Sequence, residues 1–322
     1  MTNYNRREFL KHMTVAGGAL ALAGSAAQAA TPEWKKQIGL EMYTVRDLTA
    51  KDYEGTLAKV AEIGYKEIEP ASANYAGMEP KQFRAMLDRY GISMPSTHIG
   101  ATAGPGLEKE LEGFQIMGLK YTEIRGGGEA APRPAGAAGA ARKAAPGSGG
   151  QAQPTEESIK RTAAQLNSNG KIAKKFGMKM LYHNHAQEFQ PFEGSALRPY
   201  DVLLSETDPA LVAMQLDIGW ASVAGQDVLA MFKKNPGRFE LWHVKDARGI
   251  KNMDSKLNQR ERMRAAMLVP IGQGEIDYKP FFANAELAGM KHFCIEQDNA
   301  ADWGDSVAAA RVSFERLNKL LS

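Results

Sequence analysis

The chain has 322 residues, of which 43% are hydrophobic and 24% charged, an ordinary globular composition that can fill a sizeable core. Its formal charge is +3 at pH 7, and Arg6, Arg7 and Lys11 outweigh one glutamate in the first 30 residues, which leaves +1 for the rest. The rest of the chain is thus nearly neutral and lacks the excess of positive charge that is typical of proteins that bind nucleic acid or anionic lipid. The single cysteine, Cys294, excludes an internal disulfide and any multi-cysteine metal site, and its apolar neighbours predict a small core residue.

The N-terminus has three features of an export signal in the expected order. Asn5–Lys11 matches the twin-arginine pattern, a weakly apolar run spans Met13–Ala27, and small residues up to Ala29 suit a signal peptidase. An amphipathic first helix is the alternative, but three glycines weaken it and no polar face repeats. We therefore predict a signal over residues 1–30, cleaved near Ala29, a periplasmic location, and no stable membrane anchor after cleavage.

From Lys36 onward, short apolar runs alternate with amphipathic helical stretches, which is typical of repeated βα units and a parallel sheet. The predicted strands are Gln37–Tyr43, Glu67–Glu69, Ser93–His98, Tyr121–Ile124, Lys179–His183, Val212–Leu216, Phe239–Val244 and His292–Ile295. The predicted helices include Tyr53–Ile63, Pro80–Tyr90, Ser158–Phe176, Val228–Lys234, Tyr278–Ala288 and Val307–Leu320. Eight units over residues 31–322 indicate one α/β domain, a (β/α)8 TIM barrel, and an open doubly wound sheet is the alternative.

Glycine punctuates the repeat, because it stands just past a helical stretch in five of the units. These glycines are Gly64, Gly91, Gly118, Gly177 and Gly289. A glycine in this position is the usual helix stop, so each is expected to end a helix before a strand begins.

Two stretches interrupt the repeat. Residues 126–154 are rich in Gly, Ala and Pro and predict a flexible insertion after the fourth strand. Residues 246–269 form a charged excursion after the seventh strand, for which we expect a solvated loop, with a lid or a partner-binding element as the alternative for both stretches.

Polar residues follow most of the predicted strands. They are Glu69 on strand two, His98 on three, Glu123 and Arg125 on four, His183 and His185 on five, Asp217 on six, His243, Lys245 and Asp246 on seven, and Glu296 and Asp298 on eight. The carboxyl ends of barrel strands converge on one mouth, so these side chains are expected to meet. Any one of them alone is explained as well by capping of the next turn.

Four consecutive strands deliver His, Asp, His and Glu, a mixed nitrogen and oxygen set that suits a divalent transition metal better than Ca²⁺. We predict one divalent ion, Mn²⁺ first and Zn²⁺ second, held by Asp217, His243, Glu296 and one imidazole of the His183/His185 pair. Strand alternation places both imidazoles of that pair on one face, so one would bind the metal and the other the substrate.

Six motifs carry a resemblance to a known family. They are Gly39–Arg46, Tyr182–His185 with Glu188 and Phe189, Leu216–Trp220, His243–Asp246, Gly272–Tyr278 and Ile295–Asp298. Together they resemble the sugar phosphate isomerase/epimerase family, which has the xylose isomerase-like barrel. The family includes ketose 3-epimerases, hydroxypyruvate isomerases, inosose dehydratases and proteins that act on 3-keto-glycosides.

The resemblance implies a single metal at the ends of strands five to eight, with Asp217, His243 and Glu296 in the ligand positions. His183 stands where the ketose epimerases have a glutamate. Endonuclease IV shares the superfamily, but its zinc cluster needs a histidine where this chain has Trp220, so a DNA-repair function is rejected.

The expected chemistry is abstraction of a proton next to a carbonyl through an enediolate, leading to isomerisation or epimerisation of a sugar or keto-sugar, with elimination as the alternative. Candidates for the base are Glu296, Glu188, His98 and Glu123. Candidates for substrate binding are His185, Lys245, Glu69, Arg46 and Trp220. A sugar-binding barrel without catalysis is a further alternative, and association into a homo-oligomer stays open.

Overall fold

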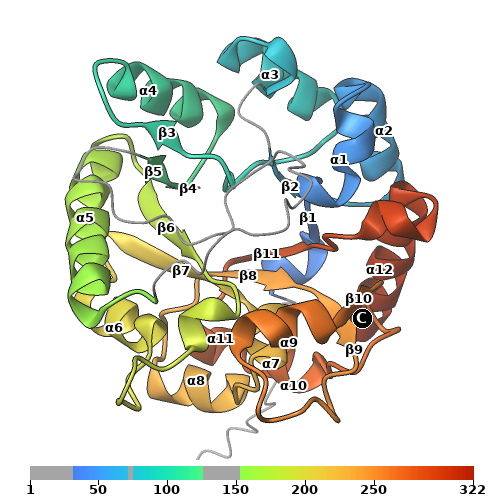
Figure 1. Cartoon of the computed structure of the whole chain (residues 1–322). Coiled ribbons are helices and arrows are strands. Elements are labelled where there is room, and N and C mark those ends of the chain that lie inside the picture. The colour runs from blue at the N-terminus through green and yellow to red at the C-terminus, as the bar shows by residue number, and fades with distance from the viewer. Residues whose placement is uncertain (1–31, 72–74, 126–152) are drawn as a thin grey trace, which may run out of the picture. The chain divides into compact units, whose positions relative to one another are not determined.

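A computed structural model describes residues 32–71, 75–125 and 153–322 (Figure 1). The chain divides into Met1–Pro32 and Glu33–Ser322, and all statements below concern the second unit. The signal predicted over residues 1–30 and nearly all of the insertion at 126–154 lie outside the described residues. Among the residues that are described, no helix has the length and apolar character needed to span a membrane.

The sheet is parallel and has seven strands in the order β2-β1-β11-β8-β7-β6-β4. Their bounds are Gly39–Glu41 (β1), Glu67–Glu69 (β2), Tyr121–Thr122 (β4), Lys179–His183 (β6), Val212–Asp217 (β7), Leu241–Val244 (β8) and His292–Ile295 (β11). Parallel neighbours need a crossover between them, and Figure 1 shows helices on the outer side of the curled sheet. The predicted TIM-barrel architecture is confirmed.

The helices match the predicted repeat. They are Arg46–Thr49 (α1), Tyr53–Ile63 (α2), Pro80–Arg89 (α3), Leu107–Met117 (α4), Glu156–Lys175 (α5), Pro199–Glu206 (α6), Ile218–Val223 (α7), Val228–Lys234 (α8), Gln259–Ala265 (α9), Lys279–Ala283 (α10), Ala285–Ala288 (α11) and Ser306–Leu321 (α12). The one helix predicted over Tyr278–Ala288 is two short helices that meet at Asn284. All five punctuating glycines have positive φ, between 62° and 121°, as helix stops require.

The third strand differs from the prediction of Ser93–His98. Only Ser93 pairs with β2, through a single bridge to Glu67, and a short strand β3 (Ala101–Thr102) pairs instead with β5 (Ile124–Arg125). The reason is Pro95, which has no N–H to donate to a ladder. Its carbonyl still accepts from the backbone of Tyr121 at 3.0 Å, so this irregular segment closes the ring between β2 and β4.

The charged excursion at residues 246–269 is not the solvated loop that we expected. It begins and ends with an antiparallel pair, β9 (Asp246–Arg248) and β10 (Met267–Val269), and contains α9. Asp246 is buried, and its carboxylate accepts backbone N–H groups from Gly272, Gly274 and Ile276 at 2.9 to 3.2 Å. This buried carboxylate ties the start of the excursion to the segment that follows its end, which composition alone did not reveal.

At the amino-terminal end of the strands, the barrel interior holds a paired polar cluster. Glu240 is buried and accepts from the ammonium groups of Lys179 and Lys291 and from the hydroxyl of Tyr121. Next to it, Nδ1 of His292 lies 3.0 Å from both carboxylate oxygens of one glutamate, Glu67. Every charge named here has a partner, as a structural end of the barrel requires.

Glu240→Gln is expected to reduce stability at neutral pH. Burial raises the pKa of Glu240, but the bonds from Lys179 and Lys291 outweigh it and hold that pKa below its ordinary value of 4.5. A carboxyl with a lowered pKa stabilises the fold above its unfolded pKa and loses this contribution as the pH falls. Denaturant unfolding at pH 7 should show a loss of about 2 kcal/mol, which shrinks as the pH falls below about 4.5.

The exposed Glu286 provides the control, since Glu286→Gln should change little at either pH. An equal loss for Glu240→Gln at pH 7 and pH 3.5 would show that the charge of Glu240 is not what stabilises this end.

Candidate metal centre and its acid–base groups

Side chains alternate in direction along each strand, and this alternation places the polar site directly above an apolar layer inside the barrel. Inside the barrel, Tyr121, Leu181, Ala213 and Leu241 form a small buried cluster. Two residues further along their strands, Leu181 is followed by His183 and Leu241 by His243, so the imidazoles point the same way one step nearer the mouth. Strand alternation thus turns alternating sequence positions into a polar layer at the carboxyl ends.

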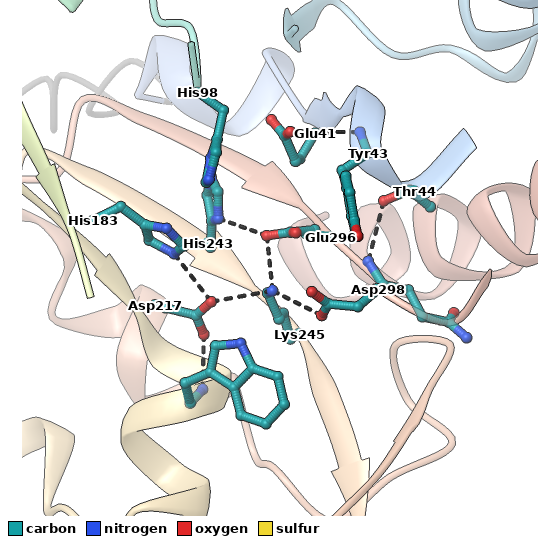
Figure 2. Close-up of polar contacts among 12 residues, drawn as sticks. Glu41, Tyr43, Thr44, His98, His183, Asp217, His243, Lys245, Glu296 and Asp298 are labelled. Atoms are coloured by element: carbon teal, nitrogen blue, oxygen red, sulfur yellow. Dashed lines mark hydrogen bonds and ion pairs between the residues drawn. The ribbon is translucent and has the colours of Figure 1, made fainter. Parts of the chain in front are cut away.

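His183, Asp217, His243 and Glu296 offer ligand atoms that all lie within 4.8 Å of one another. His183 Nε2 is 3.2 Å from Asp217 Oδ2, and His243 Nδ1 is 2.7 Å from Glu296 Oε2 (Figure 2). These are the four residues expected from the sequence to hold the metal, and the structure brings them together. All four are buried.

The donor set fits a divalent transition metal. His243 Nδ1 and Glu296 Oε2 are buried and face each other, yet neither completes a directed hydrogen bond, which suits atoms that share a cation. Two imidazoles and two carboxylates are donors that Zn²⁺ and Mn²⁺ both accept. A bound ion would therefore be held by the ends of β6, β7 and β8 and by Glu296, just after β11.

The two carboxylate oxygens of Asp217 have different roles, one in capping a helix and one in the candidate metal site. Oδ1 caps α7 by accepting the backbone N–H of Trp220 at 2.7 Å, whereas Oδ2 faces His183. The capping role that sequence reasoning weighed as the alternative is thus real, but it occupies one oxygen and leaves the other for a cation.

Of the two neighbouring histidines, His183 joins the cluster and His185 stands beside it. Their ring centroids are 4.8 Å apart. Burial and the positive charges of His243 and His98 hold the pKa of His183 well below its ordinary value, so its ring is neutral and has a lone pair for a metal. Burial and His183 lower the pKa of His185 in the same way.

Glu69, for which the sequence suggested substrate binding, contacts two imidazoles in the structure. One oxygen accepts from Gln215 at 2.6 Å and from the hydroxyl of Ser96. The other faces His243 Nε2 at 3.1 Å and His98 Nδ1 at 3.4 Å. A carboxylate behind a metal-binding histidine fixes its ring and tautomer, and Gln215 and Ser96 in turn fix the carboxylate.

The two histidines on Glu69 are charged in the absence of a metal. Burial lowers the pKa of His98, but its hydrogen bond to Glu69 and the charges of Glu69 and Glu296 raise that pKa to about 9. Burial also lowers the pKa of His243, and Glu69 and Glu296 raise it to about 10. The site therefore contains both neutral and protonated imidazoles within a few ångströms of one another.

Lys245 places an ammonium among the carboxylates. Its Nζ lies 2.8 Å from Glu296 Oε2, 2.8 Å from Asp298 Oδ2 and 3.4 Å from Asp217 Oδ2. The side chain is 1% exposed and passes over the ring of Trp220 at 5.4 Å. Burial lowers the pKa of Lys245, but Asp298, Glu296 and Asp217 raise it well above its ordinary value.

The remaining predicted site residues lie around this centre. Glu188 is buried and its Oε2 accepts the backbone N–H of His185 at 2.9 Å, so it positions that histidine. The negative charge of Glu123 contributes to raising the pKa of His98. Arg46 lies 4.0 Å over the ring of Tyr43 and does not contact the cluster through any described pair.

Sequence reasoning missed Glu41. It is fully buried, one of its oxygens accepts the backbone N–H of Tyr43 at 3.4 Å, and the other has no hydrogen-bond partner. Burial and the charges of Glu69 and Glu296 raise the pKa of Glu41 well above its ordinary value. The available signal was its place at the end of β1, which the over-long predicted strand Gln37–Tyr43 concealed.

A separate polar cavity of about 170 Å³ lies beside the short helix Gln187–Phe189. Gln187, Gln190, Phe192 and Gln259 are among the residues that line it, and no residue of the metal cluster does. We therefore place the candidate site at the buried polar cluster at the strand ends and not at this cavity.

Comparison with known proteins agrees with this geometry. The xylose isomerase-like TIM barrel family matches residues 57–320. An inosose dehydratase of Geobacillus kaustophilus is 30% identical over 254 residues, covering 70% of this chain and 73% of that protein. A sugar phosphate isomerase/epimerase structure from Parabacteroides distasonis has a TM-score of 0.64 at 20% identity, covering 92% and 97% of the two chains. The zinc-containing IolI protein has a TM-score of 0.60 at 13% identity, covering 89% and 98%.

The chain therefore belongs to the xylose isomerase-like TIM barrel family, a family of enzymes to which the matched inosose dehydratase is related. The resemblance seen in the six sequence motifs is confirmed. A His, Asp and Glu cluster that suits a metal is present, and the nature of the metal and of the reaction belong to the proposal below.

Metal analysis tests the cluster directly. Purified wild type supplied with Mn²⁺ or Zn²⁺ should retain close to one ion per chain, and Asp217→Ala and Glu296→Ala should each lose it, because each removes a carboxylate ligand. Elemental analysis after gel filtration is the measurement. Glu286→Ala, an exposed glutamate outside the site, is the matched control and should keep the metal. Wild type that retains no ion would contradict the site.

Proposed function

We propose that the protein is a divalent-metal-dependent lyase that removes water from a keto-sugar or an inosose by abstracting a proton next to the carbonyl. The observation that carries the proposal is the placement of His98 and His185, two imidazoles whose ring centroids lie 5.0 Å and 4.8 Å from that of His183. Their surroundings shift the two pKa values in opposite directions, up for His98 and down for His185. An elimination needs one group to take a proton and another to give one, and this pair supplies both.

His183, Asp217, His243 and Glu296 would hold the metal, for which Mn²⁺ is our first choice and Zn²⁺ the second. When bound, such an ion supplies Lewis-acid polarisation of a carbonyl oxygen. Glu69 keeps the ring of His243 in one orientation, and Glu188 does the same for the backbone of His185. These contacts would preorganise the site before a substrate enters.

His185 is the base in this proposal. It follows the metal-binding strand by two residues, its ring is 4.8 Å from that of His183, and its backbone is tied to Glu188. Its lowered pKa keeps it neutral and able to accept a proton at neutral pH. The four candidates for the base that we weighed from the sequence did not include His185, because that residue was assigned to substrate binding.

His98 is the acid. Its ring centroid is 5.0 Å from that of His183, and Glu69 keeps it protonated. In the elimination, His185 takes the proton from the carbon next to the carbonyl and the electron pair of that C–H bond forms a C=C bond. The bond from the next carbon to its hydroxyl breaks, and the hydroxyl leaves as water with the proton of His98. The step is redox-neutral.

Isomerisation or epimerisation, the reaction we expected first from the sequence, is the second candidate. It shares the proton abstraction and differs in that His98 returns a proton to carbon rather than to oxygen. Dehydration is preferred because the relative matched over 73% of its length is an inosose dehydratase, whereas the isomerase neighbours share 20% identity or less. An inosose and 3-keto-glycosides are therefore the first substrates to assay.

The two candidates separate in ²H₂O. Wild type with Mn²⁺ and an inosose should form a dehydrated product, seen by NMR and by a new enone absorbance. His185→Asn should lose about 10²-fold or more in rate, because the base is gone. His98→Asn should still exchange the substrate proton with solvent while elimination falls strongly. His292→Asn, a histidine paired with Glu67 at the other end of the barrel, is the control.

Each outcome has a definite meaning. Deuterium in an epimer or isomer with no dehydrated product would favour the second candidate. Metal binding with neither exchange nor product across the keto-sugar panel would favour a sugar-binding barrel without catalysis and would overturn the proposal.

We also propose that residues 1–30 direct twin-arginine export, which rests on the sequence pattern alone. Replacing Arg6 and Arg7 by lysine should hold the full-length chain in the cytoplasm because the pair is the recognised feature. Cell fractionation measures this. Equal periplasmic amounts of the wild type and the double variant would contradict it.

A further inference from the structure

We propose that Lys245 is an internal counter-cation that holds the metal-binding carboxylates in the metal-free protein and gives them up to the metal while it remains paired with Asp298. The inference rests on the metal site of the proposed function and goes beyond it, because it assigns to this lysine a control over metal affinity.

The first support is that the ammonium and the imidazoles share the same oxygens. Asp217 Oδ2 lies 3.2 Å from His183 Nε2 and 3.4 Å from Lys245 Nζ. Glu296 Oε2 lies 2.7 Å from His243 Nδ1 and 2.8 Å from Lys245 Nζ. The oxygens that would bind a metal between the imidazoles are thus already in contact with a positive charge.

The second support is electrostatic. An ion bound to these oxygens would share them with the ammonium, and like charges close together in a buried site repel strongly. Metal binding is therefore opposed for as long as Lys245 stays on Asp217 and Glu296. Conversely, without a metal and without the ammonium, the buried carboxylates of Asp217 and Glu296 would have only the imidazoles beside them to offset their charge.

The third support is that Asp298 offers the ammonium a place to stay. It lies 2.8 Å from Lys245 Nζ, belongs to none of the candidate metal groups, and is more exposed than the others, with 32% of its side chain accessible. Figure 2 shows Lys245 between the Asp217 and Glu296 pair on one side and Asp298 on the other. A small movement of the ammonium toward Asp298 would release the two ligands.

The backbone of Lys245 is fixed, so only its side chain can move. The hydroxyl of Tyr278 accepts from Lys245 N at 3.0 Å and donates to Lys245 O at 2.5 Å. A Cβ at Gly219 would lie 2.5 Å from Lys245 Cβ, so α7 can approach this closely only because position 219 is glycine. Tyr278 and α7 thus leave the start of the Lys245 side chain little room to move.

The test combines Lys245→Met with Asp298→Asn, alone and together, in the full chain stripped of metal with EDTA. Mn²⁺ and Zn²⁺ are titrated by calorimetry, and the melting temperature of each metal-free variant is recorded. Lys245→Met should bind metal about tenfold more tightly, since the competing charge is gone, yet melt several degrees lower without metal. One substitution with two opposite effects is not expected of a merely structural lysine.

Asp298→Asn should weaken metal binding about tenfold, because the ammonium then has only the ligand carboxylates to pair with. In the Lys245→Met background this effect should largely disappear, which a double-mutant cycle measures. Lys245→Gln repeats the charge removal if the methionine variant folds poorly. Lys179→Met, which removes a lysine paired with Glu240 at the other end of the barrel, should leave metal affinity unchanged.

The failures are distinguishable. A wild type that binds neither Mn²⁺ nor Zn²⁺ contradicts both the proposed function and this exchange. Metal binding that is equal or weaker in Lys245→Met, or an effect of Asp298→Asn that persists in full in that background, overturns the exchange alone and leaves the proposed function standing.

Discussion

The structure depends on compensating a group of carboxylates that the fold removes from water. Glu69, Asp217 and Glu296 are almost fully buried at the carboxyl ends of the strands, and isolated charges in such a place are costly. Two protonated imidazoles and the ammonium of Lys245 supply the opposite charge. The site is therefore an assembly of cations and anions in which a metal ion would be one more cation.

This constraint explains why the two ends of the barrel differ. At the amino-terminal end, Glu240 and Glu67 are each fully paired with nearby lysine or histidine, and nothing there calls for a ligand. At the mouth, by contrast, one buried oxygen of Glu41 has no hydrogen-bond partner, and Oε2 of Glu296 has ion-pair contacts to His243 and Lys245 without a directed hydrogen bond. Polar atoms buried without hydrogen bonds cost free energy, and a fold keeps them where a ligand or a reaction uses them.

Much of the architecture could be predicted from the sequence. Alternating apolar runs and helical stretches indicated the barrel, the five glycines marked helix ends, and β6 and β11 have the predicted bounds. The prediction failed where one residue overrides a pattern. Pro95 removes a donor from the third strand, and the carboxylate of Asp246 ties down a stretch whose composition indicates a loop.

The site could also be predicted only in part. The topology of the barrel brings the strand ends together, but the individual contacts depend on the direction of each side chain. Asp217, His243, Glu296 and His183 meet as the strand-end rule requires. The rule does not tell which carboxylate faces a metal and which stands behind a histidine, so Glu69 was assigned to substrate and Glu41 was overlooked. Nor does it give protonation states, since those of His98 and His185 depend on which charges surround each ring.

The arrangement at the mouth relates stability to chemistry. A barrel that carries its own ammonium in the site can fold with its carboxylates compensated before any metal arrives, which avoids a buried, unpaired negative cluster in the metal-free state. The same ammonium lowers the affinity of the site for its metal, so the stability of the metal-free fold and the strength of metal binding oppose each other at one residue. Lys245 sets that balance, and Asp298 decides how easily it shifts.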